Sequence, residues 1–112
     1  NYTSQDIAEY DGSGDGTGIQ TKERNYEKLD IVSDIVDIPV SDNYFDNVLC
    51  IEVIEHVPDP IEALKEIHRI LKKGGNLILT APFNSLTHYA PYHYSTGFSR
   101  YYYFRASHFF FL

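Results

Sequence analysis

A glutamate and three histidines in the second half of the sequence could carry out acid–base chemistry. Glu55 and His56 are adjacent, while His88 and His93 lie in a stretch rich in tyrosine. An imidazole changes its protonation state near neutral pH, so each histidine is a candidate proton acceptor. Plainer roles also fit: the Glu55–His56 pair can cap a helix or face solvent, and residues 87–94 can form an aromatic loop packed on a sheet.

A zinc site is not expected from these residues. Zinc ligands usually come at short spacing, and the single cysteine, Cys50, lies inside an apolar run typical of a strand. The glycine-rich residues 11–18 resemble a calcium loop only in part, because Lys22 stands where a bidentate glutamate is required. They do not follow a buried strand, as a phosphate-binding turn would. We therefore interpret this segment as a flexible surface insert, and expect no metal.

Asp6 and Asp34 each stand where a short strand is expected to end. A carboxylate in that place can accept hydrogen bonds from ribose hydroxyls or from an adenine amino group. Aspartates are equally common in ordinary turns and caps, and the spacing alone does not choose between the two roles.

The elements that position these residues are clearest between Phe45 and Pro82. Residues 48–51 form an apolar run typical of a strand buried on both faces of a parallel sheet. Asp59 can cap a helix with Pro60 in its first turn, and apolar residues then recur at helical spacing. We expect Lys72 and Lys73 in the last turn, Gly74 or Gly75 as the stop, and a second strand over 77–81. A strand, helix and parallel strand of this length form a βαβ unit.

Composition narrows the class of protein. The chain has 112 residues and a formal net charge of −7, with its basic residues scattered, so nucleic acid is not an expected partner. One cysteine excludes an internal disulfide framework and fits the reducing cytoplasm. No apolar run is long enough to span a membrane. Many aromatic residues follow Phe83, and the sequence closes on Phe109, Phe110, Phe111 and Leu112.

Four segments together resemble a known family, the S-adenosylmethionine-dependent class I methyltransferases that act on small molecules. The resemblance runs from about Tyr2 to Phe98 and implies an α/β Rossmann-like sheet with helices on both faces. The family's first strand, with its acidic and glycine pattern, has no counterpart here. The four segments are Asp34-Ile35-Val36-Asp37-Ile38-Pro39, Phe45-Asp46-Asn47-Val48-Leu49-Cys50, Glu55-His56-Val57-Pro58-Asp59-Pro60 and Leu71-Lys72-Lys73-Gly74-Gly75-Asn76-Leu77-Ile78-Leu79-Thr80-Ala81-Pro82.

The resemblance implies a cofactor, S-adenosylmethionine, and a small-molecule methyl acceptor. By position, Asp6 takes the ribose hydroxyls, Asp34 the adenine amino group and Ile35 the adenine ring edge. The residues implied on the methionine side of the cofactor are Cys50, Ile51, Glu52 and His56. Residues 83–94 face the acceptor, with His88, His93 and Tyr94 as substrate-side candidates, and no catalytic residue is assigned.

We expect a partial methyltransferase domain over residues 1–98 and an aromatic tail over 99–112. Because an exposed apolar tail or unpaired sheet edge seeks a partner, self-association is expected through one of them. Two other hypotheses stay open. The chain can be a non-catalytic remnant of the fold that acts in protein association, or a different nucleotide-binding α/β enzyme with affinity for a dinucleotide.

Overall fold

The structure is a computed structural model that describes residues 2–9, 18–19, 28–89 and 92–102. Three strands come first along the described chain, and a 3-10 turn, an α-helix and a fourth strand follow. In sequence order the elements are β1 (Gln5–Asp6), β2 (Ile31–Val32), β3 (Phe45–Ile51), the 3-10 turn η1 (Ile54–His56), α1 (Pro60–Ile70) and β4 (Leu71–Thr80).

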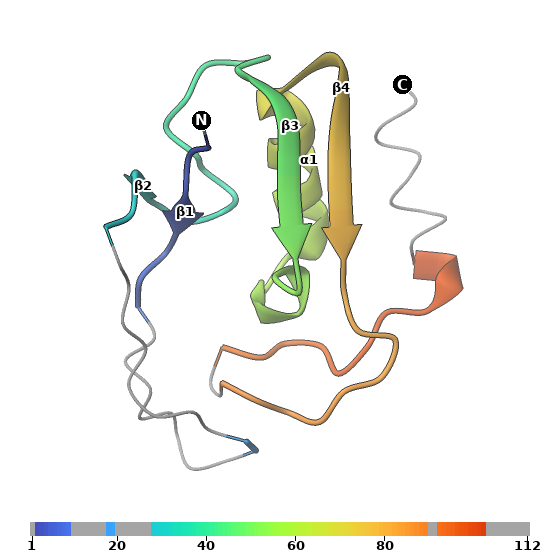
Figure 1. Ribbon diagram of the computed structural model, residues 1–112. Coiled ribbons are helices and arrows are strands. Elements are labelled where there is room, and N and C mark those ends of the chain that lie inside the picture. The colour runs from blue at the N-terminus through green and yellow to red at the C-terminus, as the bar shows by residue number, and fades with distance from the viewer. Residues whose placement is uncertain (1, 10–17, 20–27, 90–91, 103–112) are drawn as a thin grey trace.

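The described strands form two parallel pairs, β1 with β2 and β3 with β4. Figure 1 shows the β1–β2 pair alongside the β3–β4 pair, with β1 and β3 as the facing inner strands. Among the described strands, β1 and β3 are not hydrogen-bonded to each other, and none lies between them. That position is where the resemblance places the family's first strand.

The βαβ unit is confirmed, and its core lies between α1 and the β3–β4 pair. Residues 63, 64, 67 and 70 of α1 are buried, which is the spacing of one helix face. The Asp59 carboxylate accepts hydrogen bonds from the backbone N–H groups of Ile61 and Glu62, so the predicted cap is present. The buried core cluster consists of Cys50, Ile54, Ile67 and Phe98.

The predicted end of the helix was wrong. α1 stops at Ile70, and Leu71 is already extended with φ −81° and ψ 131°. Lys72 and Lys73 belong to β4, in an irregular stretch where pairing jumps from Phe45–Leu71 to Asn47–Asn76. Gly74 has a positive φ of 77° there, which a glycine adopts easily. This glycine therefore forms part of a bulge in the strand and does not end the helix.

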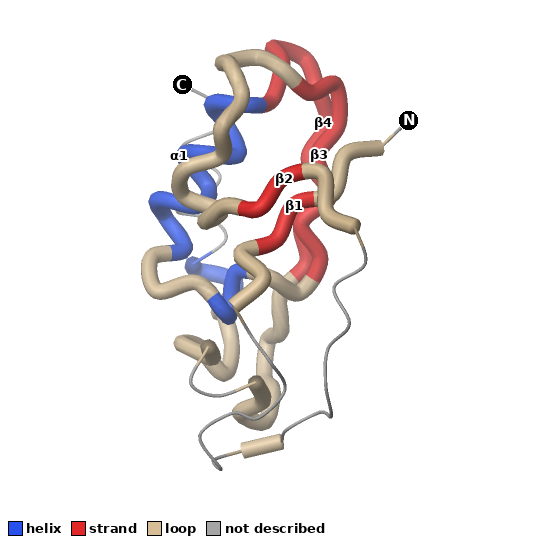
Figure 2. The backbone as a smooth tube through the Cα atoms, turned by 90° about the vertical axis from the view of Figure 1, so that its left-hand side faces the viewer, coloured by secondary structure: helices blue, strands red, loops and turns tan. Residues whose placement is uncertain are grey.

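The prediction that β3 is buried on both faces was also wrong for the described part of the chain. Val48 and Cys50 pack toward α1, but Leu49 is 69% exposed and its partner Ile78 on β4 is 55% exposed. Figure 2 shows α1 on one side of the strands. Because side chains alternate along a strand, covering one face leaves every second apolar residue open.

Several predictions fall on residues outside the described ranges. These are the glycine-rich segment, of which only Gly18 is described, and the aromatic tail beyond residue 102. The division into 1–98 and 99–112 therefore stays a prediction. Within the described ranges, none of the helices has the length and apolar character needed to cross a membrane.

Candidate functional site

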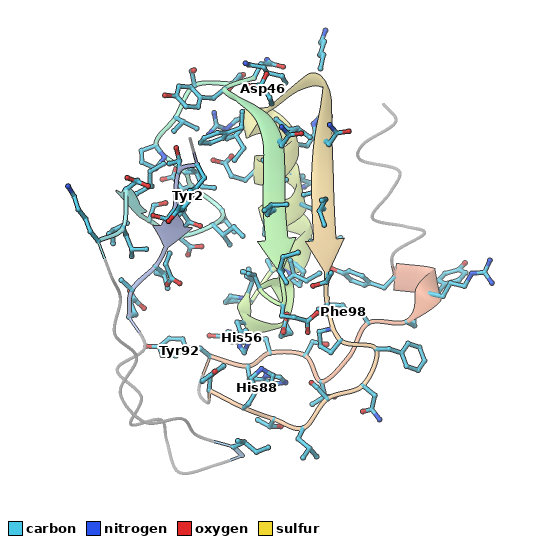
Figure 3. The ribbon with its side chains drawn as sticks, in the orientation of Figure 1. Tyr2, Asp46, His56, His88, Tyr92 and Phe98 are labelled. Atoms are coloured by element: carbon cyan, nitrogen blue, oxygen red, sulfur yellow. The ribbon has the colours of Figure 1, made fainter. Side chains whose placement is uncertain are left out.

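The carboxyl ends of β3 and β4 bring together the residues expected to do chemistry. η1 follows β3 and supplies Glu55 and His56, while the segment after β4 supplies His88 and His93. Figure 3 shows His56 and His88 close together beyond the arrowheads of the two strands. Ligand sites in parallel sheets lie at this edge, because the strand ends there are free to carry functional loops.

His88 and His93 belong to a loop over residues 83–98, here named the histidine loop, of which residues 83–89 and 92–98 are described. Its two ends are held together by hydrogen bonds from Phe98 N to Pro82 O, 2.9 Å, and from Ser85 N to Thr96 O, 2.7 Å. Gly97 lies so close to the Phe83 carbonyl that a Cβ there would clash with it.

The histidine loop is also tied to η1. The backbone carbonyl of Glu55 accepts hydrogen bonds from Tyr94 N at 2.8 Å and Ser95 N at 3.2 Å. The loop therefore has a fixed position over the strand ends, although it follows η1 by about thirty residues of chain.

His56, His88 and His93 form a compact group, here named the histidine cluster. Ring centroids are 4.7 Å apart for His56–His88, 4.5 Å for His88–His93 and 5.3 Å for His56–His93. One ring nitrogen from each can be chosen so that all three lie within 4.8 Å of one another. Short-range spacing did not reveal this group, because folding brings its members together from distant positions.

Two members of the cluster have their ring orientation fixed by backbone carbonyls. His56 Nδ1 is hydrogen-bonded to Tyr92 O, and His88 Nδ1 lies 2.9 Å from Leu86 O. The Nε2 atoms of the same two rings face one another at 3.1 Å. The two rings thus direct their second nitrogens at a shared point.

Glu55 places a buried carboxylate beside the cluster. The residue is fully buried, and neither carboxylate oxygen has a hydrogen-bond partner among the described residues. Its Oε1 lies 3.8 Å from His56 Nε2. Burial raises the pKa of Glu55, because the charged form loses its hydration. The sequence drew attention to Glu55 next to His56, but gave no sign that its side chain points inward.

His93 is half-buried as a residue, but its ring nitrogens face inward. Both of its ring nitrogens are inaccessible and lack hydrogen-bond partners among the described residues. Burial lowers the pKa of His93, and the neighbouring His88 and His56 lower it further. Two inaccessible ring nitrogens without hydrogen bonds are costly unless a ligand satisfies one of them.

The residues expected on the adenosine side lie at the ends of the other two strands. Asp6 ends β1, and its Oδ1 accepts a hydrogen bond from Ala8 N at 2.9 Å. Asp34 follows β2, and its Oδ1 accepts one from Val36 N at 3.1 Å. Both carboxylates stabilise local turns. A carboxylate accepts several hydrogen bonds, so the turn role and a ligand role are compatible.

The remaining predicted residues differ in how they are placed. Ile35 is half-buried and packs on the core. The Cys50 side chain is buried in the core, which raises its thiol pKa to about 12. Ile51 and Glu52 are exposed at the end of β3, where Glu52 N donates to Thr80 O at 3.1 Å. Tyr94 is exposed on the histidine loop.

The sequence matches the model of a methyltransferase domain over residues 7–79. It is also 48% identical over 44 residues to cycloartenol-C-24-methyltransferase 1 of Oryza sativa, which is 39% of this chain and 13% of the relative. Over 36 residues it is 47% identical to the ubiquinone biosynthesis O-methyltransferase of Pseudomonas aeruginosa, covering 32% and 16% of the two chains.

A third relative gives the longest match of these. The chain is 40% identical over 58 residues to the demethylmenaquinone methyltransferase of Staphylococcus epidermidis, covering 51% of this chain and 24% of the relative. The chain thus spans 13% to 24% of the length of these three relatives. The family model covers well over half of the present chain, and it includes β2, β3, η1, α1 and nearly all of β4. The chain belongs to the methyltransferase domain family, within the class I S-adenosylmethionine-dependent methyltransferases.

Proposed function

We propose that the protein transfers the methyl group of S-adenosylmethionine to a small polar acceptor. Family membership supports the reaction class. The observation that carries the proposal is the convergence of polar residues at one edge: Asp6 and Asp34 follow β1 and β2, and the histidine cluster lies beyond β3 and β4. A cofactor and an acceptor need adjacent sites at this edge.

Asp6, Asp34 and Ile35 would bind the adenosine part of the cofactor. β1 and β2 pair in parallel with Asp6 opposite Val32, so the two aspartates follow neighbouring strands. One would accept from the ribose hydroxyls and the other from the adenine amino group, with Ile35 against the ring.

The methionine side would then extend along the end of β3. Because the Cys50 side chain is buried in the core, only its backbone could face the cofactor. Ile51 and Glu52 end the strand with exposed side chains, and His56 follows on η1. Together they would lie between the adenosine site and the histidine loop.

The histidine loop would hold the acceptor, with Tyr94 at its surface. The sulfonium methyl group is already activated, so the protein's main task is to align the acceptor atom behind it. As a lone pair of the acceptor forms the new bond to the methyl carbon, the sulfur–carbon bond breaks and its electron pair stays on sulfur. The products are S-adenosylhomocysteine and the methylated acceptor, whose proton is lost to solvent. Alignment needs a loop of fixed position, which agrees with its closed ends and its two bonds to Glu55 O.

Calorimetric titration of the chain with S-adenosylhomocysteine tests the cofactor site. Asp34→Asn should weaken binding about tenfold or more, because a hydrogen bond to a charged group contributes roughly 1.5–3 kcal/mol. Asp37→Asn is the matched control, since Asp37 is an exposed aspartate three residues away. Equal loss in both variants, or no binding by the folded chain, would contradict the proposed cofactor site.

A further inference from the structure

The histidine cluster has a geometry that methyl transfer alone does not require. His56 Nδ1 and His88 Nδ1 each face a backbone carbonyl, which only accepts hydrogen bonds. Each Nδ1 must therefore carry the proton. In the neutral ring the lone pair is then on Nε2, and these two Nε2 atoms are the ones that face each other at 3.1 Å.

Two lone pairs at this distance repel unless a positive centre lies between them. The separation itself suggests which centre. Two imidazoles on a tetrahedral zinc ion, each about 2.0–2.1 Å from the metal, have their nitrogens about 3.3 Å apart. The observed 3.1 Å is close to that value. Metal-bound histidines also typically donate their other N–H to a backbone carbonyl or carboxylate, as both rings do here.

His93 and Glu55 supply the rest of the environment. His93 contributes a third imidazole within 4.8 Å, and both of its nitrogens are buried without a partner among the described residues. The Glu55 carboxylate is equally buried and without a hydrogen bond, 3.8 Å from His56 Nε2. A cation in the cluster would satisfy a buried nitrogen and interact favourably with the buried carboxyl group.

We propose that His56, His88 and His93 bind a divalent transition-metal ion, with zinc as the best fit. Imidazole nitrogens suit zinc, cobalt or nickel, whereas magnesium and calcium prefer oxygen ligands. The His56 side chain is 20% exposed, so an ion can reach the cluster from solvent.

Three protein ligands leave a fourth coordination position on a tetrahedral ion. Resting on the proposed function, that position would hold an oxygen or nitrogen of the methyl acceptor, since the cluster is on the acceptor side. The ion would then fix the acceptor atom that the cofactor must approach, and the three imidazoles would act as ligands rather than as bases.

The test is titration of the whole chain with zinc chloride in the absence of cofactor. We expect one ion per chain and a higher Tm with added zinc, because an ion bound by the folded state stabilises it. His88→Gln and His93→Gln should each weaken binding by about 100-fold or more, since loss even of an outer-shell partner costs 10–100-fold. The control His68→Gln changes a histidine on the exposed side of α1, and should bind zinc as the unmodified chain does.

Cobalt titration of the unmodified chain provides a readout that does not depend on how the variants fold. The expected result is the intense visible absorption of tetrahedral Co²⁺, which zinc removes and magnesium does not. Absence of one-to-one zinc binding by the folded chain would overturn the proposal. The short distance between the two Nε2 atoms would then be explained by a proton shared between the rings. Unchanged affinity in both cluster variants would also overturn it. Because S-adenosylhomocysteine binding is measured without zinc, failure of this site and failure of the cofactor site are distinguishable.

Discussion

The two sides of the candidate site are held in place by different means. On the aspartate side, Asp6 ends β1 and Asp34 lies two residues after β2, and both strands have only two residues. Each carboxylate accepts a hydrogen bond from a backbone N–H group two residues further along the chain. On the histidine side, Glu55 and His56 belong to a turn that begins at Ile54, which is fully buried in the core. The histidine loop contributes Phe98 to the same core cluster.

This difference has a consequence for stability. Changes at the strand ends on the aspartate side should affect ligand binding with little effect on folding. The histidine side shares its supporting residues with the core, so damage to the core should also displace the histidines. Ile54→Ala tests this contrast directly, and two changes with smaller expected effects test the contacts that hold α1 in place.

The largest effect is expected for Ile54→Ala. Truncating a fully buried isoleucine costs about 2–5 kcal/mol of unfolding free energy, through lost burial and the cavity left behind. The same change should weaken zinc binding, because η1 carries His56. Val32→Ala on β2 is the matched control, since Val32 is 64% exposed and should change stability by about 0.5 kcal/mol or less. Urea unfolding of both variants measures this, and similar losses would break the contrast.

The second prediction concerns the contact that joins α1 to the segment between β2 and β3. Arg69 donates to Ile38 O, Val40 O and the Asp42 carboxylate at 2.8–2.9 Å, and pairs with Glu66 at 2.6 Å. Glu66 also accepts from Ile38 N at 2.8 Å. The hydrogen bond from Arg69 lowers the pKa of Glu66 below its usual 4.5.

A lowered carboxylate pKa means that the ionised form stabilises the fold. This contribution is complete above pH 4.5 and is lost as the pH falls through the lower, folded-state pKa. Glu66→Gln should cost about 1–3 kcal/mol at pH 7 and flatten the fall in stability below pH 4.5. Glu62→Gln is the control, because Glu62 pairs with Lys65 while about half exposed. Urea unfolding between pH 3 and pH 7 measures this. If the free energy of unfolding falls with decreasing pH as steeply in Glu66→Gln as in the unmodified chain, Glu66 is not the source of the acid sensitivity.

The smallest effect is expected at the start of α1, three residues after His56. Asp59→Ala removes the acceptor for two N–H groups and should cost about 1 kcal/mol. Asp37→Ala is the control, because Asp37 is exposed and does not cap a helix, so its loss should lower the free energy of unfolding by less than about 1 kcal/mol. A melting curve followed by circular dichroism compares the two, and an equal shift would mean that the cap does not stabilise α1.

Local patterns explain how much of this could be predicted from the sequence. The Asp59 cap, the buried face of α1 and the position of Asp6 at the end of β1 depend on neighbouring residues, and all three are present in the structure. Asp34 lies two residues after β2. The end of α1 was missed because the Gly74–Gly75 pair serves a strand bulge as readily as a helix stop.

The histidine cluster could not be predicted in the same way. His56 and His88 come together only because β3 and β4 are neighbours and the histidine loop folds back on η1. The inward orientation of Glu55 depends on the same long-range contacts, so adjacent letters in the sequence do not reveal it.

The closed base of the histidine loop has a consequence for how this enzyme family could diversify. Because Phe98 N donates a hydrogen bond to Pro82 O, the two ends of the histidine loop lie next to each other. A segment with this geometry can be lengthened, shortened or exchanged at modest entropic cost, since closure is already provided at its ends. Gly97 is the exception, because the Phe83 carbonyl leaves no room for a side chain. The proposed acceptor site therefore lies on a segment whose sequence and length could change, apart from Gly97, without redesign of the sheet beneath it.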